Sequence, residues 1–257
     1  MKRTDIKNKN IILTGASAGI GLELLKILST YSGVKIVAIA RHIDNLPQKE
    51  GAIYPFSADM STQEGIDNVF DFAKRTLGDI DIFIANAGFA YLEKLDNPDW
   101  NHIENIFSLN VFSPVYSLEK LVQTGNRKKV FVCTISGAGL ASLPAYSLYC
   151  STKAALHHFI NTYRYEKPKS LQITAVYPVA TRTAFFDKAT GEEQTPLPRP
   201  IQEAKTVARK IIKGIERGKK QVFPSTLFRT FYPIGRAFPF MLHIYSLLER
   251  RKVKKWL

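Results

Sequence analysis

Short runs of apolar residues alternate along the first 225 residues with longer segments in which apolar residues recur every three or four positions. Short apolar runs are typical of strands buried on both faces, and the longer period is typical of amphipathic helices. The pattern predicts seven strands, over residues 10–14, 35–40, 53–57, 81–85, 129–135, 171–177 and 220–223. It predicts helices over residues 19–30, 62–77, 99–124, 146–165 and 201–217.

This alternation predicts an α/β fold: a doubly wound parallel sheet of about seven strands with helices on both faces. The 257 residues are 45% hydrophobic, which is enough to fill one large core. We therefore predict one domain over residues 1–225 and an extension over residues 226–257. Residues 184–200 have no period and are interrupted by glycine and prolines, so we predict a loop that covers a site.

The cysteines and the N-terminus favour a cytoplasmic protein. Cys133 and Cys150 lie in apolar stretches, which indicates reduced thiols rather than a disulfide framework. Neither has neighbours typical of a metal ligand, and we predict no metal site. Residues 1–10 are charged and carry no apolar signal segment, so we do not expect secretion.

The positive charge is concentrated at the end of the chain. Residues 205–257 contain 14 Lys and Arg against Glu216 and Glu249, which is nearly all of the formal net charge of +14. Residues 226–257 are rich in aromatic and aliphatic side chains, but a membrane-spanning helix of about 20 apolar residues is excluded by Arg229, Pro233, Arg236 and Pro239. Three interpretations stay open: this extension packs on the body or a second subunit, it rests on a membrane surface with its basic cluster on anionic lipid, or that cluster is a solvated chain end.

A glycine-rich sequence, TGASAGIG over residues 14–21, lies between the first predicted strand and the first predicted helix. Small residues at such a turn let the backbone approach a pyrophosphate near the helix N-terminus. Gly15, Gly19 and Gly21 follow G-x-x-x-G-x-G rather than the usual dinucleotide spacing G-x-G-x-x-G. The turn predicts a dinucleotide site, and a tight turn without a ligand is the alternative.

A second motif combines Tyr149 and Lys153, which are four residues apart on one face of a predicted helix, with Ser136, which follows a predicted strand. Reduction of a carbonyl needs a proton for the oxygen, yet a free tyrosine loses its proton only at about pH 10. We expect Lys153 to lower the pKa of Tyr149, and Ser136 to hydrogen-bond the substrate oxygen.

With these motifs in order, residues 8–224 resemble the short-chain dehydrogenase/reductase family. Asp59 and Met60 resemble its adenine-contacting acidic pair, residues 85–88 resemble its NNAG element, and Asn110 falls at its helix asparagine. Residues 177–183 resemble the segment that closes around the nicotinamide. The resemblance implies a Rossmann fold and hydride transfer between a nicotinamide and a carbonyl carbon, with Tyr149 as proton donor or acceptor.

The same resemblance assigns the site residues. The catalytic set it implies is Asn110, Ser136, Tyr149 and Lys153, with Lys153 also holding the nicotinamide ribose and Asn110 helping to bind a water. The cofactor contacts it implies are Gly15, Ser17, Gly19, Ile20, Gly21, Arg41, Asp59, Met60, Asn86, Ala87, Gly88, Tyr149, Lys153, Pro178, Val179, Thr181 and Thr183. Two of these residues have a purely structural alternative. Asn110 would then disturb its helix, and Asn86 would brace the strand ends.

Three residues depart from the family's pattern. Ala85 replaces the first asparagine of NNAG, Gly137 replaces a second serine, and Val179 replaces a glycine after Pro178. None of them removes a group that performs the chemistry. Val179 adds a β-branched side chain near the nicotinamide segment, so we expect it to affect substrate specificity.

The end of the second predicted strand bears on the choice of cofactor. An acidic side chain there would bind the ribose hydroxyls and repel a 2′-phosphate. Here the strand ends in Ala40, Arg41 and His42, so the sequence favours NADP(H), with the Arg41 guanidinium on the phosphate. An ordinary surface charge is the alternative for Arg41.

The predicted pocket walls are residues 89–95, 137–146 and 184–200, which are rich in Phe, Tyr, Leu and Ala. They favour a largely apolar carbonyl or alcohol as the small-molecule substrate. The resemblance implies a homodimer through the two long central helices. Alternatives are a non-catalytic NADP sensor or a membrane-surface regulatory protein, and a nucleic-acid partner is not expected because no recognition motif accompanies the charge.

Overall fold

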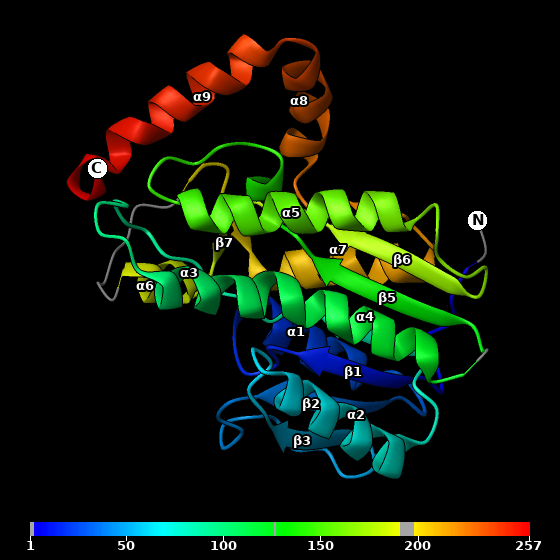
Figure 1. Cartoon of the computed structure of the whole chain (residues 1–257). Coiled ribbons are helices and arrows are strands. Elements are labelled where there is room, and N and C mark those ends of the chain that lie inside the picture. Colours follow the sequence, from blue (N-terminus) through cyan, green and yellow to red (C-terminus); the bar gives the residue numbers. More distant parts are fainter. Residues whose placement is uncertain (1–2, 126, 191–197) are drawn as a thin grey trace.

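A seven-stranded parallel sheet forms the centre of the protein (Figure 1). The computed structural model describes residues 3–125, 127–190 and 198–257. The strand order is β3-β2-β1-β4-β5-β6-β9. The strands are β1 (Asn10–Thr14), β2 (Lys35–Ala40), β3 (Ile53–Ser57), β4 (Ile82–Ala85), β5 (Lys129–Thr134), β6 (Leu171–Val176) and β9 (Gln221–Val222). All seven predicted strands are present, and the doubly wound α/β fold is confirmed.

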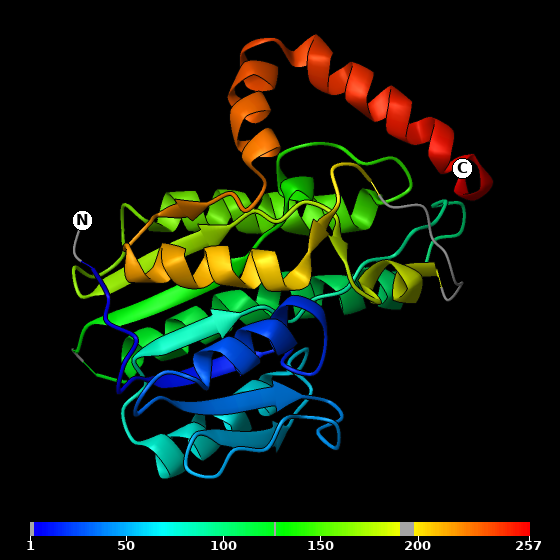
Figure 2. The ribbon, with the colours of Figure 1, turned by 180° about the vertical axis from the view of Figure 1, so that it is seen from behind.

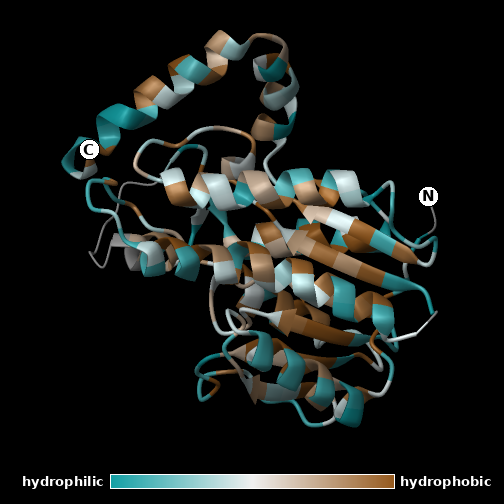
Figure 3. Ribbon diagram, in the orientation of Figure 1, coloured by the Kyte–Doolittle hydropathy of each residue, from teal (hydrophilic) through white to brown (hydrophobic). Residues whose placement is uncertain are grey.

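Helices cover both faces of this sheet, as the two opposite views show (Figures 1 and 2). Helices α2 (Gln63–Leu77), α4 (Ser113–Gln123) and α5 (Ser147–Tyr163) pack on one face, and α1 (Gly19–Leu28) and α7 (Ala204–Glu216) on the other. Successive strand residues point to opposite faces, so Ile11 and Leu13 pack toward α1 and α7 while Ile12 packs toward α2 and α4. Because both faces are covered, the central strands β1, β2, β4 and β5 are apolar along most of their length (Figure 3).

The single helix predicted over residues 99–124 is interrupted in the structure. It consists of α3 (Trp100–Phe107), a π-helical turn η1 (Ser108–Phe112) and α4. Asn110 lies in this turn with only 1% of its surface exposed. Its side chain hydrogen-bonds Phe89 and Thr152, two partners that the spacing of apolar residues does not reveal. Turns of this kind are common at functional sites.

Two other predictions need correction. Residues 184–200, predicted as a loop, include a short helix α6 (Phe185–Thr190), in which Phe186 is buried against the ring of Tyr146. A helix of six residues, less than two turns, is too short to produce a detectable period. The rest of that prediction, residues 191–197, lies outside the described residues. Residues 201–203, predicted as helical, are extended because β8 (Gln202–Glu203) pairs with β7 (Thr181–Arg182), and α7 begins only at Ala204.

The C-terminal extension forms two helices, α8 (Thr226–Ala237) and α9 (Pro239–Lys252), and a short turn η3 (Lys254–Trp256). They lie beyond α5 on one side of the molecule (Figure 1). The Tyr245 hydroxyl donates to the Arg199 carbonyl at 3.1 Å, and the Ser246 hydroxyl donates to the Ser142 carbonyl at 2.9 Å. The extension therefore contacts the body. Within the described ranges, no helix has the length and apolar character needed to cross a membrane.

Candidate active site

A cavity of about 1280 Å³ opens at the carboxyl ends of β1, β4 and β5. The chain passes from β1 to β2 on one side, and β4 lies against β1 on the other side. Ligands of open parallel sheets bind at such a switch point. All the predicted site residues line this cavity except Gly21 and Asn110, which lie behind its wall.

The glycine turn after β1 brings backbone very close to backbone. Gly15 has a φ of 67°, in the left-handed region that favours glycine. A Cβ on Gly21 would lie 1.9 Å from the Gly15 carbonyl oxygen, which explains why Gly21 is needed although it does not face the cavity. Ala18, the N-cap of α1, makes no side-chain cap, so the first amides of that helix are available to an anion. These features fit the pyrophosphate of a dinucleotide.

The floor of the cavity is held by Thr14 and Asn86. The Thr14 hydroxyl oxygen accepts hydrogen bonds from the backbone N–H groups of Asn86 and Ala87, both at 3.0 Å. The Asn86 amide donates to the Thr14 carbonyl at 3.3 Å and accepts from the Thr134 hydroxyl at 3.3 Å. Asn86 therefore braces the ends of β1, β4 and β5 and also lines the cavity.

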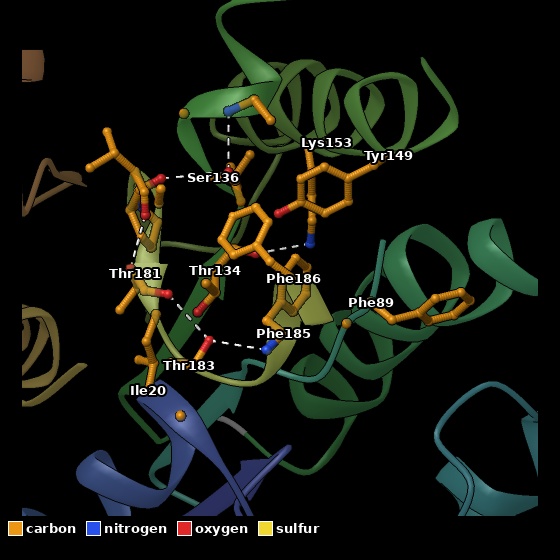
Figure 4. A pocket seen from close by; sticks show the side chains of 18 of the residues that line it. Ile20, Phe89, Thr134, Ser136, Tyr149, Lys153, Thr181, Thr183, Phe185 and Phe186 are labelled. Atoms are coloured by element: carbon orange, nitrogen blue, oxygen red, sulfur yellow. Dashed lines mark hydrogen bonds between the residues drawn. The ribbon is translucent and has the colours of Figure 1, made fainter. Parts of the chain in front are cut away.

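Ser136, just after β5, has a strained backbone. Its φ is 120°, a value that residues other than glycine rarely adopt. The surroundings hold it there: its hydroxyl oxygen accepts from the Ala138 N–H at 3.2 Å, and the hydroxyl donates to the Pro178 carbonyl at 3.5 Å. Strain of this kind persists at functional sites because neighbouring contacts over-determine the conformation. The result is a serine hydroxyl facing the cavity (Figure 4).

Tyr149 and Lys153 extend from α5 into the same pocket as Ser136 (Figure 4). Tyr149 is 8% exposed and Lys153 4%. The Lys153 Nζ lies 5.6 Å from the centre of the Tyr149 ring and donates to the Thr134 carbonyl at 3.3 Å. The end of β5 and one face of α5 therefore meet at the cavity, as the sequence predicts.

The electrostatics of this pair differ from the expectation that Lys153 lowers the pKa of Tyr149. Burial raises the pKa of the Tyr149 phenol above its ordinary value, and the hydrogen bond with Ser136 only partly opposes this. Burial also lowers the pKa of Lys153 to about 8. Both effects arise because the site excludes water from the charged forms. Tyr149 accordingly keeps its proton at neutral pH in this structure.

The low pKa of Lys153 predicts a pH-dependent stability. The folded protein holds this proton less tightly than the unfolded chain, whose lysine titrates at about 10.5. The penalty for burying the charge is thus full below pH 8 and vanishes as the pH rises toward 10.5. We expect Lys153→Met to remove a penalty of about 3 kcal/mol at pH 7 but little at pH 10. Urea unfolding of both proteins without cofactor measures this, and a difference that is constant between pH 7 and 10 contradicts it.

Asn110 reaches the site only through other residues. Its side-chain N–H groups donate to the Phe89 carbonyl at 2.9 Å and to the Thr152 hydroxyl at 3.1 Å, and its oxygen accepts from the Phe89 N–H at 3.1 Å. A Cβ on Gly88 would lie 2.9 Å from that oxygen and 3.4 Å from the Lys153 Nζ. Asn110 therefore positions the backbone of residues 88–89 against α5, and its predicted water stays a prediction.

The other end of the cavity contains Ala40, Arg41, Asp59 and Met60. Burial acts to raise the pKa of Asp59, but the N–H and hydroxyl of Ser61, with the charge of Arg41, hold it below its ordinary value. Asp59 is therefore ionised at neutral pH. Its Oδ1 already accepts both Ser61 donors, at 2.9 and 2.7 Å.

The segment after β6 closes one side of the pocket. The hydroxyl of Thr181 donates to the Val179 carbonyl at 2.9 Å, and the hydroxyl of Thr183 accepts from the Phe185 N–H at 3.3 Å at the start of α6. Phe185 then lies 5.6 Å from Tyr149, measured between ring centres. Figure 4 shows Thr181, Thr183 and Phe185 around the same space as Tyr149.

Helices α8 and α9 form part of the cavity wall, which was not predicted from the sequence. Both helices line it, through Leu227, Phe228, Phe231, Tyr232, Gly235, Met241, Leu242 and Tyr245. The Phe228 ring lies 3.3 Å from where a Cβ on Gly137 would be, so the glycine found in place of a serine leaves room for this ring. Positions 228, 231, 232 and 235 share one helical face, a signal that was available in the sequence.

Comparison with known proteins agrees with this geometry. A profile of the short chain dehydrogenase family matches residues 9–194. The chain is 27% identical over 252 residues to human epidermal retinol dehydrogenase 2, covering 90% of this chain and 81% of that protein. It is 27% identical over 229 residues to 3-ketodihydrosphingosine reductase of Bos taurus, covering 80% and 69%.

Solved structures show the same fold. A short-chain dehydrogenase from Burkholderia cenocepacia in complex with NADP has a TM-score of 0.80 at 20% identity, covering 95% of this chain and 99% of that one. One from Burkholderia phymatum in complex with NAD has a TM-score of 0.80 at 17% identity, covering 93% and 96%. With the family profile extending over most of the chain, this protein belongs to the short-chain dehydrogenase family and is an oxidoreductase acting on CH–OH groups.

Proposed function

We propose that this protein is an NADP(H)-dependent enzyme that interconverts a carbonyl and an alcohol, with Tyr149 as the proton donor or acceptor. The observation that supports it most is the meeting of Ser136, Tyr149 and Lys153 in one cavity with the glycine turn after β1. The bound cofactor supplies or accepts the hydride.

The chain's own groups handle the oxygen and its proton. The Ser136 hydroxyl hydrogen-bonds the substrate oxygen, and the buried Tyr149 phenol gives that oxygen its proton in reduction or takes it in oxidation. Lys153 would hold the ribose of the nicotinamide, and Asn110 keeps residues 88–89 in place. The aromatic rings of Phe185 and Phe186 exclude water from this end of the cavity.

The preference for NADP(H) rests on the end of β2. Ala40 is 7% exposed there, Arg41 lines the cavity beside it, and neither offers a carboxylate to ribose hydroxyls. We expect Ala40→Asp to lower the ratio of kcat/KM for NADPH over NADH at least tenfold, because the new carboxylate repels the 2′-phosphate and accepts from the ribose. Steady-state kinetics with both cofactors measure this. An unchanged ratio would contradict the proposed preference for NADP(H).

The substrate we propose is largely apolar. The cavity that holds Tyr149 is lined by many aromatic and aliphatic side chains, including Phe89, Leu143, Phe186, Phe231 and Leu242. Two relatives are named for retinol and 3-ketodihydrosphingosine, which supports a lipid-like carbonyl or alcohol. Turnover of NADPH against a panel of aldehydes, ketosteroids, acyl-chain ketones and sugars tests this, and a preference for sugars contradicts it.

We further propose a cytoplasmic homodimer through α4 and α5, with peripheral membrane contact through residues 226–257. Exposed apolar side chains support the two contacts: Phe112, the residue before α4, is 58% exposed, and several large residues of α8 and α9 are exposed as well. Light scattering decides the oligomeric state.

A further inference from the structure

Helix α9 carries exposed apolar residues on the side that faces away from the protein. The side that faces the body is buried or half-buried and consists of Leu242, Tyr245, Ser246, Glu249 and Val253. The outward side carries Phe240, Ile244, Leu247 and Leu248, which are 62%, 51%, 46% and 51% exposed. A helix packed on a domain normally buries its apolar stripe. This one buries Leu242, Tyr245 and Val253 together with the Glu249 carboxylate, and it still presents a second row of large apolar groups to the outside.

Helix α8 adds a second exposed stripe. Leu227, Phe231, Ile234 and Phe238 recur every three or four residues on one helical face and are 52%, 52%, 41% and 54% exposed. The two helices meet closely, since a Cβ on Gly235 would lie 2.8 Å from Leu242. We call these four residues and the four of α9 the apolar outer face. Several large apolar groups on two adjacent helices are typical of an interaction surface.

The charge beside this face indicates what covers it. Residues 226–257 contain seven Lys and Arg against Glu249 alone, and Glu249 is paired with Lys252 at 2.6 Å. At the end of α9 a groove is lined by Arg250, Arg251 and Lys254 together with Leu247 and Leu257. Cations next to leucines fit the phosphate and acyl chain of an anionic lipid. A second copy of this face would instead bring like charges together.

The cavity extends to the same face. Leu227 and Phe231 of α8 and Met241 of α9 line the cavity, and all three are more than a third exposed. Phe228 and Leu242 of the same helices also line the cavity and are half-buried. The exposed apolar groups of α8 and α9 are therefore part of the same wall as the residues around Tyr149.

We propose that the apolar outer face docks on an anionic phospholipid bilayer and that the apolar carbonyl substrate enters the cavity from that bilayer, between α8 and α9. The entry route rests on the proposed function. Docking does not, because it depends only on the exposed groups and their charge.

Docking is tested by sedimentation of the full chain with vesicles of phosphatidylcholine alone or with 30% phosphatidylglycerol. We expect the wild type to bind the anionic vesicles at least tenfold more tightly. The variant Ile244→Glu with Leu248→Glu, at positions that do not line the cavity, should lose at least tenfold of that binding. The control Trp100→Glu with Tyr165→Glu changes two residues that are 78% and 94% exposed elsewhere and should bind as the wild type does.

Entry is tested with NADPH and two aldehydes, hexadecanal held in the anionic vesicles and butanal in solution. The outer-face variant should lose at least tenfold in turnover of hexadecanal and stay within twofold for butanal, with thermal unfolding confirming that it is folded. Equal losses on both aldehydes, or no loss on either, overturn the entry route. A wild-type dimer that this variant dissociates overturns docking, because a second copy then covers the face. Wild type that binds vesicles but reduces neither aldehyde refutes the proposed function and leaves docking supported.

Discussion

Replacement of Tyr149 by phenylalanine is expected to lower kcat for carbonyl reduction by about a thousandfold. A positioned proton donor contributes roughly a hundredfold to ten-thousandfold to such a reaction. Phenylalanine keeps the ring, whose neighbours Tyr146 and Phe185 lie 6.4 and 5.6 Å away between centres, so the pocket retains its shape. NADPH affinity should therefore stay within a few-fold. Steady-state kinetics and NADPH fluorescence titration measure the two effects.

The matched control is Tyr163→Phe, near the end of the same helix. Tyr163 stacks on Phe159 at 5.6 Å and lies outside the cavity, so its hydroxyl has no part in the chemistry we propose. We expect full activity from it. If Tyr149→Phe keeps more than a tenth of the wild-type kcat, another group donates the proton.

Replacement of Gly21 by alanine is expected to destabilise the fold by more than about 3 kcal/mol and to abolish NADPH binding. Its Cβ would lie 1.9 Å from the Gly15 carbonyl oxygen, which is backbone and cannot rotate away. To relieve the contact, α1 must shift from the turn after β1, and the floor of the cofactor site shifts with it. Overpacking of a rigid site costs about 1–3 kcal/mol, and occasionally more. Urea unfolding and cofactor titration measure the loss.

Gly51→Ala is the matched control. Gly51 has a φ of 71° but no atom within 4 Å of its Cβ position, so only the backbone preference opposes the alanine. That cost is about 1–2 kcal/mol, with no effect on the cofactor. If Gly21→Ala and Gly51→Ala destabilise the fold equally, the contact with the Gly15 carbonyl is not the reason that position 21 needs a glycine.

Much of the fold was predictable because its signals are local. Each strand is a short apolar run, and each helix that covers the sheet has an apolar stripe of its own, so the order of elements follows from neighbours in the sequence. The interrupted helix around Asn110 was not predictable, since its partners, Phe89 and Thr152, are 21 and 42 residues away. The short helix α6 was missed for a related reason, because only the burial of Phe186 against Tyr146 reveals it.

By itself the sequence determined the seven-stranded sheet, the turn at Gly15 and the grouping of Ser136, Tyr149 and Lys153 at one strand end and one helix face. Local apolar patterns predict the sheet, and the order of the motifs along the chain, with the family they resemble, predicts the site. The tertiary structure alone decided that burial raises the pKa of Tyr149, that Phe228 fills the space above Gly137, and that α8 and α9 line the cavity while exposing apolar groups. Each of these depends on which distant parts of the chain pack around a side chain and exclude water from it. No local sequence pattern encodes that packing.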